Sequence, residues 1–162
     1  MSQLKKVIMY TDGGCLKNPG PGGYGVVLLN GDHRKELSGG FRRTTNNRME
    51  IMAAIAGLQA LKTQCEVTLY TDSQYLVNAM TKGWVKRWQA NGWMRNREEK
   101  ALNSDLWEQL LRLCQQHKVE FVWIRGHAGN SENERCDQLA KQAARQKDLP
   151  ADLVYESQEG QR

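Results

Sequence analysis

Two short apolar segments of the chain end in the same three residues, Tyr-Thr-Asp. The first covers residues 6–12 (KVIMYTD) and the second covers residues 67–72 (VTLYTD). Both are short and apolar, and the first is rich in β-branched residues, which predicts two buried strands. If these strands lie side by side and parallel, the side chains of Asp12 and Asp72 emerge at one carboxyl edge of the sheet, where open α/β sheets bind ligands.

The rest of the chain predicts three more strands and four main helices. Strands are expected at residues 24–29 and 34–41, joined by an Asn-Gly turn, and at residues 119–125. A loop rich in Gly and Pro is expected at residues 13–23. Capping residues and apolar spacings of three and four predict helices that begin near residues 46, 73, 104 and 131. Five strands, with helices mainly after the third, indicate an α/β fold with a mixed sheet.

Length and composition limit the class of protein. The 162 residues fit one domain, expected at residues 1–148, and the apolar periodicity stops after Leu149, so residues 149–162 are expected to form a C-terminal tail. No apolar run approaches the ~20 residues of a membrane span, and the N-terminus lacks the apolar stretch of a secretory signal. We therefore expect a cytoplasmic protein, and a monomer because no apolar interface is evident. The net charge of +5 weakly favours a polyanionic partner.

Two further carboxylates are candidates for the same site. Glu50 and Asp137 each lie next to an apolar stripe in the opening turns of a predicted helix, from which they can point toward the sheet edge. For an isolated residue of this kind, a solvated side chain near the positive end of the helix dipole is usually the better interpretation, and convergence of all four carboxylates would decide for a shared site. Carboxylates that converge need a counter-charge, and Mg²⁺ suits a few carboxylates plus a substrate phosphate. Two such ions roughly 4 Å apart can activate water and stabilise a leaving oxygen.

Four separate motifs resemble type 1 ribonuclease H over roughly residues 6–146. They are TDG at 11–13, NNRME at 46–50, YTDSQ at 70–74 and GHAGNSENERCD at 126–137. The resemblance implies a five-stranded mixed sheet, with three antiparallel strands and then parallel ones, flanked by helices and carrying a basic handle at about residues 82–101. It also implies an endonuclease that hydrolyses the RNA strand of RNA–DNA hybrids and leaves 5′-phosphate and 3′-hydroxyl ends.

The resemblance also implies roles for single residues. Two Mg²⁺ ions are expected with substrate, with Mn²⁺ as an alternative ion, and His127 is expected to assist by moving a proton or helping product leave. The metal ligands correspond to Asp12, Glu50, Asp72 and Asp137. The residues that correspond to the family's RNA contacts are Asn18, Asn46, Asn47, Gln74 and the backbone near Cys15. Those that correspond to its DNA contacts are Arg43, Thr45 and Asn103 for a phosphate and Trp88 for a deoxyribose.

The handle segment departs from the lysine-rich pattern of close relatives. Gln89-Ala90 and Glu98-Glu99 dilute its positive charge, so we expect weaker or more salt-sensitive binding of the hybrid. Two other functions were weighed. A non-catalytic hybrid-binding module would not need all four carboxylates, and a transposase-like nuclease or phosphomonoesterase would not need the handle and the Gly-His-Ala-Gly loop.

Overall fold

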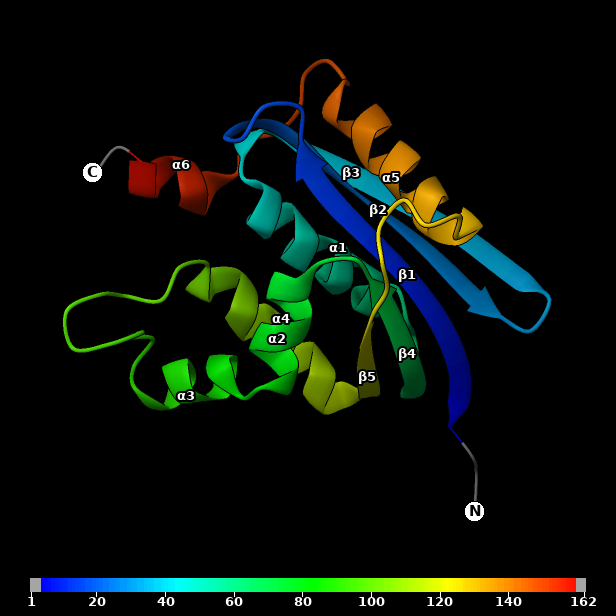
Figure 1. Cartoon of the computed structure of the whole chain (residues 1–162), viewed down its shortest axis with the longest axis horizontal. Helices are drawn as coiled ribbons and strands as arrows, with labels where there is room; N and C mark the ends of the chain where they lie inside the picture. The colour runs from blue at the N-terminus through cyan, green and yellow to red at the C-terminus, as the bar shows by residue number, and fades with distance from the viewer. Residues whose placement is uncertain (1–3, 160–162) are drawn as a thin grey trace.

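The computed structural model describes residues 4–159 and contains a five-stranded sheet in the order β3-β2-β1-β4-β5 (Figure 1). β1 pairs with β2, and β2 with β3, in antiparallel fashion, whereas β4 and β5 run parallel to β1. This confirms the mixed sheet that the sequence predicts. The strands are β1 (Lys5–Cys15), β2 (Gly20–Asn30), β3 (His33–Thr44), β4 (Cys65–Thr71) and β5 (Lys118–Trp123).

The two segments that share the Tyr-Thr-Asp ending are neighbours in the sheet. Tyr10 lies opposite Tyr70 and Thr11 lies opposite Thr71, and the parallel pairing of β1 with β4 ends there. The two tyrosine rings stack with their centroids 5.0 Å apart. β1 itself continues to Cys15 along β2, so it is longer than predicted, yet Asp12 still lies where the two strands part.

Helices cover both faces of the sheet. α1, α2 and α4 lie on one face, where their apolar side chains form the main core with β1, β2 and β4, and α5 packs across β1, β2 and β3 on the other face (Figure 1). In the described residues, no helix is both long and apolar enough to cross a bilayer. The helices are α1 (Asn46–Gln59), α2 (Gln74–Thr81), α3 (Trp84–Ala90), α4 (Ser104–Gln116), α5 (Ser131–Ala144) and α6 (Leu153–Glu159).

The glycine-rich segment 13–23 was predicted to be a loop, and this prediction is wrong for most of its length, because β1 extends to Cys15 and β2 begins at Gly20. The glycines instead allow helices to approach the strands closely. A Cβ on Gly13 would lie 2.3 Å from the backbone of Met49 in α1, and one on Gly23 would lie 2.2 Å from the carbonyl oxygen of Ala140 in α5. Both distances are shorter than a Cβ can tolerate, so only glycine fits there.

Two helix boundaries also differ from the sequence pattern. The side chain of Asn130 caps α5 by accepting hydrogen bonds from the backbone N–H groups of Glu132 and Asn133, so the cap lies one residue before the predicted Ser131. In the predicted tail, residues 153–159 form α6, which packs on β3. Residues 160–162 of that tail lie outside the described residues.

Candidate active site

Three carboxylates converge where β1 and β4 separate. Asp12 lies on β1, Asp72 follows β4 directly, and Glu50 lies in the first turns of α1. One carboxylate oxygen from each residue lies within 4.8 Å of the other two. The sequence motifs pointed to these three residues, and the fold brings them together.

Close packing around the site fixes two of these carboxylates. Glu50 reaches Asp12 because the glycine at position 13 lets the start of α1 lie against β1. A Cβ on Gly126 would lie 2.7 Å from Oδ2 of Asp72, so the glycine leaves room for that carboxylate. The indole Nε1–H of Trp123 donates a 3.1 Å hydrogen bond to the carbonyl oxygen of Asp72. Sequence reasoning missed Gly126 and Trp123 as supports of the site, since no local pattern links them to Asp72.

The protonation of the cluster reflects burial and mutual repulsion. Burial, followed by the charges of Asp72 and Asp137, raises the pKa of Asp12 to about 8. Burial, followed by the charges of Asp12 and Asp72, also raises the pKa of Glu50 well above its ordinary value. Oε2 of Glu50 is buried and has no hydrogen-bond partner among the described residues. A divalent cation would neutralise the repulsion and satisfy this oxygen, so the residues present fit such an ion.

Asp137 and His127 line the same pocket as the three carboxylates, which has a volume of about 420 Å³. Asp137 is outside the group of three, and its Oδ2 forms a 2.9 Å ion pair with Nζ of Lys141 one turn along α5. His127 is exposed, and its backbone has a positive φ of 55° in the loop before α5. The fold therefore places both predicted residues at the pocket, with Lys141 as a cation that the sequence did not predict.

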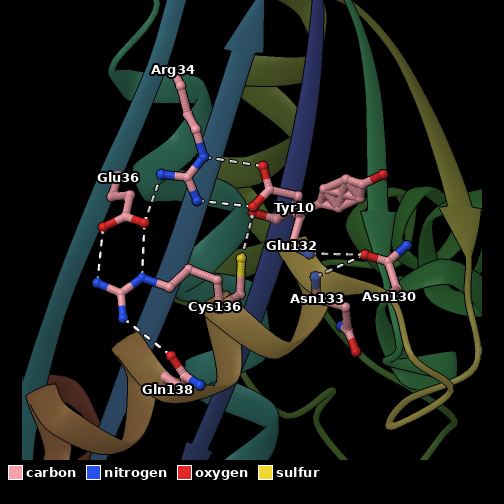
Figure 2. A network of polar contacts seen from close by, with 9 residues as sticks. Tyr10, Arg34, Glu36, Asn130, Glu132, Asn133, Cys136 and Gln138 are labelled. Atoms are coloured by element: carbon pink, nitrogen blue, oxygen red, sulfur yellow. Dashed lines mark hydrogen bonds and ion pairs between the residues drawn. The ribbon is translucent and has the colours of Figure 1, made fainter.

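An ion-pair network fastens α5, which carries Asp137, to the sheet (Figure 2). Arg34 on β3 binds both Glu36 and Glu132, and Arg135 on α5 binds Glu36 at 2.8 Å. These arginines lower the pKa of Glu36 to about 2. On the next residue of α5, the Sγ of Cys136 donates to the carbonyl oxygen of Tyr10 at 3.3 Å. Asp137 thus follows directly after a helix segment that is tied to both β3 and β1.

Several of the predicted hybrid contacts are linked to one another beside the carboxylates. The backbone N–H of Cys15 donates to Oδ1 of Asn46 at 2.7 Å, and the backbone N–H of Asn46 donates to Oδ1 of Asn18 at 3.2 Å. Gln74, which begins α2 two residues after Asp72, is exposed. The two hydrogen bonds join the end of β1 and the loop after it to the start of α1.

Two of the three predicted DNA-phosphate residues, Thr45 and Asn103, line a second pocket of about 530 Å³. Thr45 caps α1 by accepting a hydrogen bond from the backbone N–H of Arg48, and the amide of Asn103 donates to the hydroxyl of Tyr75. The guanidinium of Arg43 binds the carboxylate of Glu159 on α6. The pocket is lined by Asn18, Pro19, Thr45, Asn46, Asn47, Leu102 and Asn103 from the body, and by Tyr155, Gln158 and Glu159 from α6.

The predicted handle consists of α3 and the irregular segment that follows it, which extends away from the sheet (Figure 1). Trp84, Trp88 and Trp93 are partly buried against the main core, and the ring of Trp88 lies 6.5 Å from that of Trp107 on α4. Arg95 pairs with Glu99, which reduces the positive charge that it can offer. The role of this segment and the deoxyribose contact of Trp88 stay predictions.

Comparison with known proteins gives consistent matches over this architecture. The family model described as RNase H matches residues 4–145. The chain is 72% identical over 151 residues to the ribonuclease H of Syntrophus aciditrophicus, which covers 93% of this chain and 87% of the relative. Among solved structures it resembles LC9-RNase H1, described as a type 1 RNase H with the type 2 active-site motif, with a TM-score of 0.80 and 34% identity over 89% of this chain and 74% of the other. It also resembles LC11-RNase H1 in complex with an RNA/DNA hybrid, with a TM-score of 0.66 and 26% identity over 85% of this chain and 96% of the other.

Proposed function

The chain belongs to the ribonuclease H family, and from that premise we propose that Asp12, Glu50, Asp72 and Asp137 hold the metal ions with which it acts. It is a hydrolase that cleaves RNA in RNA–DNA hybrids. The observation that carries the proposal is the convergence of three carboxylates within 4.8 Å around a buried, unpartnered oxygen of Glu50. Such a site is electrostatically incomplete without a cation.

Two Mg²⁺ ions are proposed, with Mn²⁺ as an alternative, and when bound they supply an activated water and a stabilised leaving oxygen. Asp12, Glu50 and Asp72 would hold the ions through their converging carboxylates. Asp137 would complete the ligand set from the same pocket, in competition with its ion pair to Lys141. His127, exposed on its loop at the pocket, acts as an auxiliary group that takes up or returns a proton. The products carry 5′-phosphate and 3′-hydroxyl ends.

The RNA strand is distinguished by its 2′-hydroxyl groups, which both donate and accept hydrogen bonds. We assign this recognition to Asn18, Asn46, Asn47, Gln74 and the backbone of Cys15, because amide groups also both donate and accept hydrogen bonds. We assign the contact with a phosphate of the DNA strand to Arg43, Thr45 and Asn103, and the contact with a deoxyribose to Trp88. Further contacts with this strand are assigned to the handle at about residues 82–101. The hydrogen bonds that already link Cys15, Asn46 and Asn18 support a preformed surface.

The setting of the protein is also proposed. We assign residues 1–148 to the catalytic domain and place the protein in the cytoplasm as a monomer. Its four cysteines are free thiols, which a reducing compartment maintains. Sedimentation of the purified chain measures the oligomeric state directly.

The test compares labelled RNA as a hybrid, a single strand and an RNA duplex, with and without Mg²⁺. Cleavage is expected only for the hybrid with metal. Asp12→Asn and Asp72→Asn should each lower the cleavage rate about a thousandfold or more, because each removes several kcal/mol of transition-state stabilisation. Both variants should still bind the hybrid with nearly unchanged affinity. Asp32→Asn, in the exposed turn between β2 and β3, is the matched control and should keep full activity. Turnover retained by either site variant would refute the ligand assignment.

A further inference from the structure

The C-terminal helix α6 lies beside the end of β3 and the start of α1 (Figure 1), where it lines the pocket that contains Thr45 and Asn103, two of the proposed DNA-phosphate residues. The third, Arg43, is outside the lining and contacts a residue of it. Its last described residue, Glu159, binds the guanidinium of Arg43 through two oxygens. Nε of Arg43 donates to Oε1 at 2.8 Å, and Nη2 donates to Oε2 at 2.9 Å. One turn earlier, Glu156 binds Arg42 in the same two-oxygen manner.

A two-oxygen contact with arginine is also the way in which this side chain binds a phosphate. The N–H groups of Arg43 that a DNA phosphate would need are therefore already taken by a carboxylate of the same chain. Glu159 is also the one acidic residue in the lining of this pocket, whose other polar members are neutral amides and hydroxyls. A phosphate that entered the pocket would meet this negative charge at close range.

The two ends of α6 are held differently. Just before the helix, Asp152 is buried and binds Arg48 and Thr44 at 2.7 Å, and Arg42 donates its backbone N–H to the carbonyl of Pro150. The contact at the far end is exposed, with 47% of the Arg43 side chain and 28% of the Glu159 side chain accessible. Exposed ion pairs contribute little and weaken in salt. The helix is thus anchored at its start, and its end can release Arg43 without unfolding the anchor.

We propose that α6 is a built-in competitor of the substrate: Glu159 occupies Arg43 in the free protein and is displaced when a DNA phosphate of the hybrid binds there. The proposal rests on the assignment of Arg43 to the DNA strand. It extends that assignment, because it makes the C-terminal helix a determinant of hybrid affinity and of its salt dependence.

The experiment measures binding of a labelled hybrid to the full chain in EDTA, where cleavage is blocked. Glu159→Gln keeps the size of the side chain and removes its charge. It should tighten binding about two- to fivefold at low salt, the range expected for an exposed ion pair. It should also steepen the slope of log affinity against log salt by up to about 0.9. The reason is that the contact of Arg43 with phosphate then releases a counterion without a competing carboxylate. Glu156→Gln, on the same helix and facing Arg42, is the matched control and should change binding less.

A double-mutant cycle separates competition from a general charge effect. Arg43→Gln should weaken binding, and in that background Glu159→Gln should no longer tighten it. Equal tightening with and without Arg43, or equal effects of the Glu156 and Glu159 variants, would overturn the proposal. If Arg43→Gln leaves hybrid affinity unchanged, both the competition and the Arg43 assignment fall, whereas metal-dependent cleavage of the hybrid by the same variant would keep the proposed catalytic function.

Discussion

The carboxylates of Glu50 and Asp12 are destabilised in their charged forms by burial and by mutual repulsion, which the protein alone does not offset. Asp12 is buried, Glu50 is half-buried with one fully buried oxygen, and both carboxyls have raised pKa values. That oxygen of Glu50 accepts no hydrogen bond within residues 4–159. Burial favours the neutral form of each group, whereas a cation favours the charged form. The protonation of this cluster and the binding of metal are therefore linked.

This linkage predicts how pH changes the stabilisation by Mg²⁺. Asp12 has a folded pKa of about 8 against an ordinary value of 3.8, so the stability that its protonated form contributes is present below pH 4 and is lost as pH rises through about 8. Metal must displace these protons. For each proton released, the apparent Mg²⁺ affinity should therefore rise about tenfold per pH unit below pH 8, which is about 1.4 kcal/mol of binding free energy. The shift in melting temperature on adding Mg²⁺, followed from pH 6 to 9, measures this dependence.

Two variants test whether the cluster causes this dependence. Asp32→Asn should keep the pH dependence of the Mg²⁺-induced shift in melting temperature, because Asp32 is exposed in a turn away from the cluster. Asp12→Asn should remove most of that pH dependence. A shift in melting temperature on adding Mg²⁺ that is the same at pH 6 and pH 9 in the unchanged protein would contradict the linkage.

The site residues could be predicted to different degrees, for physical reasons. Asp12 and Asp72 follow from the repeated strand ending, since parallel neighbouring strands bring their carboxyl ends together. Glu50 and Asp137 needed the resemblance, because a glutamate or aspartate in a first helical turn is usually solvated. Lys141, which pairs with Asp137, was missed because an i,i+4 lysine on a helix looks like an ordinary surface residue.

At the level of elements, α6 and the segment before it belong to the packed body. Arg48 on α1 is 2% exposed and binds two carboxylates, Asp152 before α6 and Asp105 in the first turn of α4. Three elements that are distant in sequence are therefore joined at one buried guanidinium. No local pattern predicts this, because the apolar periodicity ends at Leu149 and the attachment is polar.

We expect Asp152→Ala to destabilise the protein. The substitution leaves Arg48 buried with one carboxylate instead of two, and removing one partner of a buried ion pair costs about 3 kcal/mol or more. Urea unfolding followed by circular dichroism measures the change in free energy of unfolding. Asp32→Ala, in the exposed turn between β2 and β3, is the control and should lie within about 0.5 kcal/mol of the unchanged protein. A similarly small effect for Asp152→Ala would mean that the buried network does not hold the C-terminal segment.

The element boundaries show the same limit of sequence reasoning. Strand and helix positions set by apolar periodicity were predicted well, including the starts of α1, α2, α4 and α5. The glycine-rich segment was misjudged because glycine is also selected where a helix packs on a strand. The need for glycine at position 23 follows only from the packing of Ala140 of α5 on β2, which local sequence does not show.

At the level of the whole molecule, positive charge is distributed unevenly with respect to the proposed substrate. The chain carries a net charge of +5, yet Arg42 and Arg43 are paired with α6, Arg95 is paired with Glu99, and Gln89-Ala90 ends α3 without charge. Affinity for a nucleic acid depends on the number of cations that reach phosphates. The pairing pattern therefore supports the expectation of modest hybrid affinity, which the net charge alone would not.

Adding lysines to the handle should strengthen hybrid binding. Gln89 and Ala90 are exposed at the C-terminal end of α3, where lysine also interacts favourably with the helix dipole. Each new phosphate contact made by Gln89→Lys plus Ala90→Lys should steepen the slope of log affinity against log salt by about 0.9. By the same relation the diluted handle should bind the hybrid more weakly and with a shallower salt dependence, so of the two effects expected from the sequence only the weaker binding follows from counterion release. Binding of a labelled hybrid in EDTA between about 50 and 200 mM salt measures this slope. Thr63→Lys plus Gln64→Lys adds the same charge before the first residue of β4, at the end of that strand away from the carboxylates, and should leave the slope nearly unchanged. If the two double variants gain equally, only net charge matters; if neither gains, residues 84–90 do not approach the DNA strand.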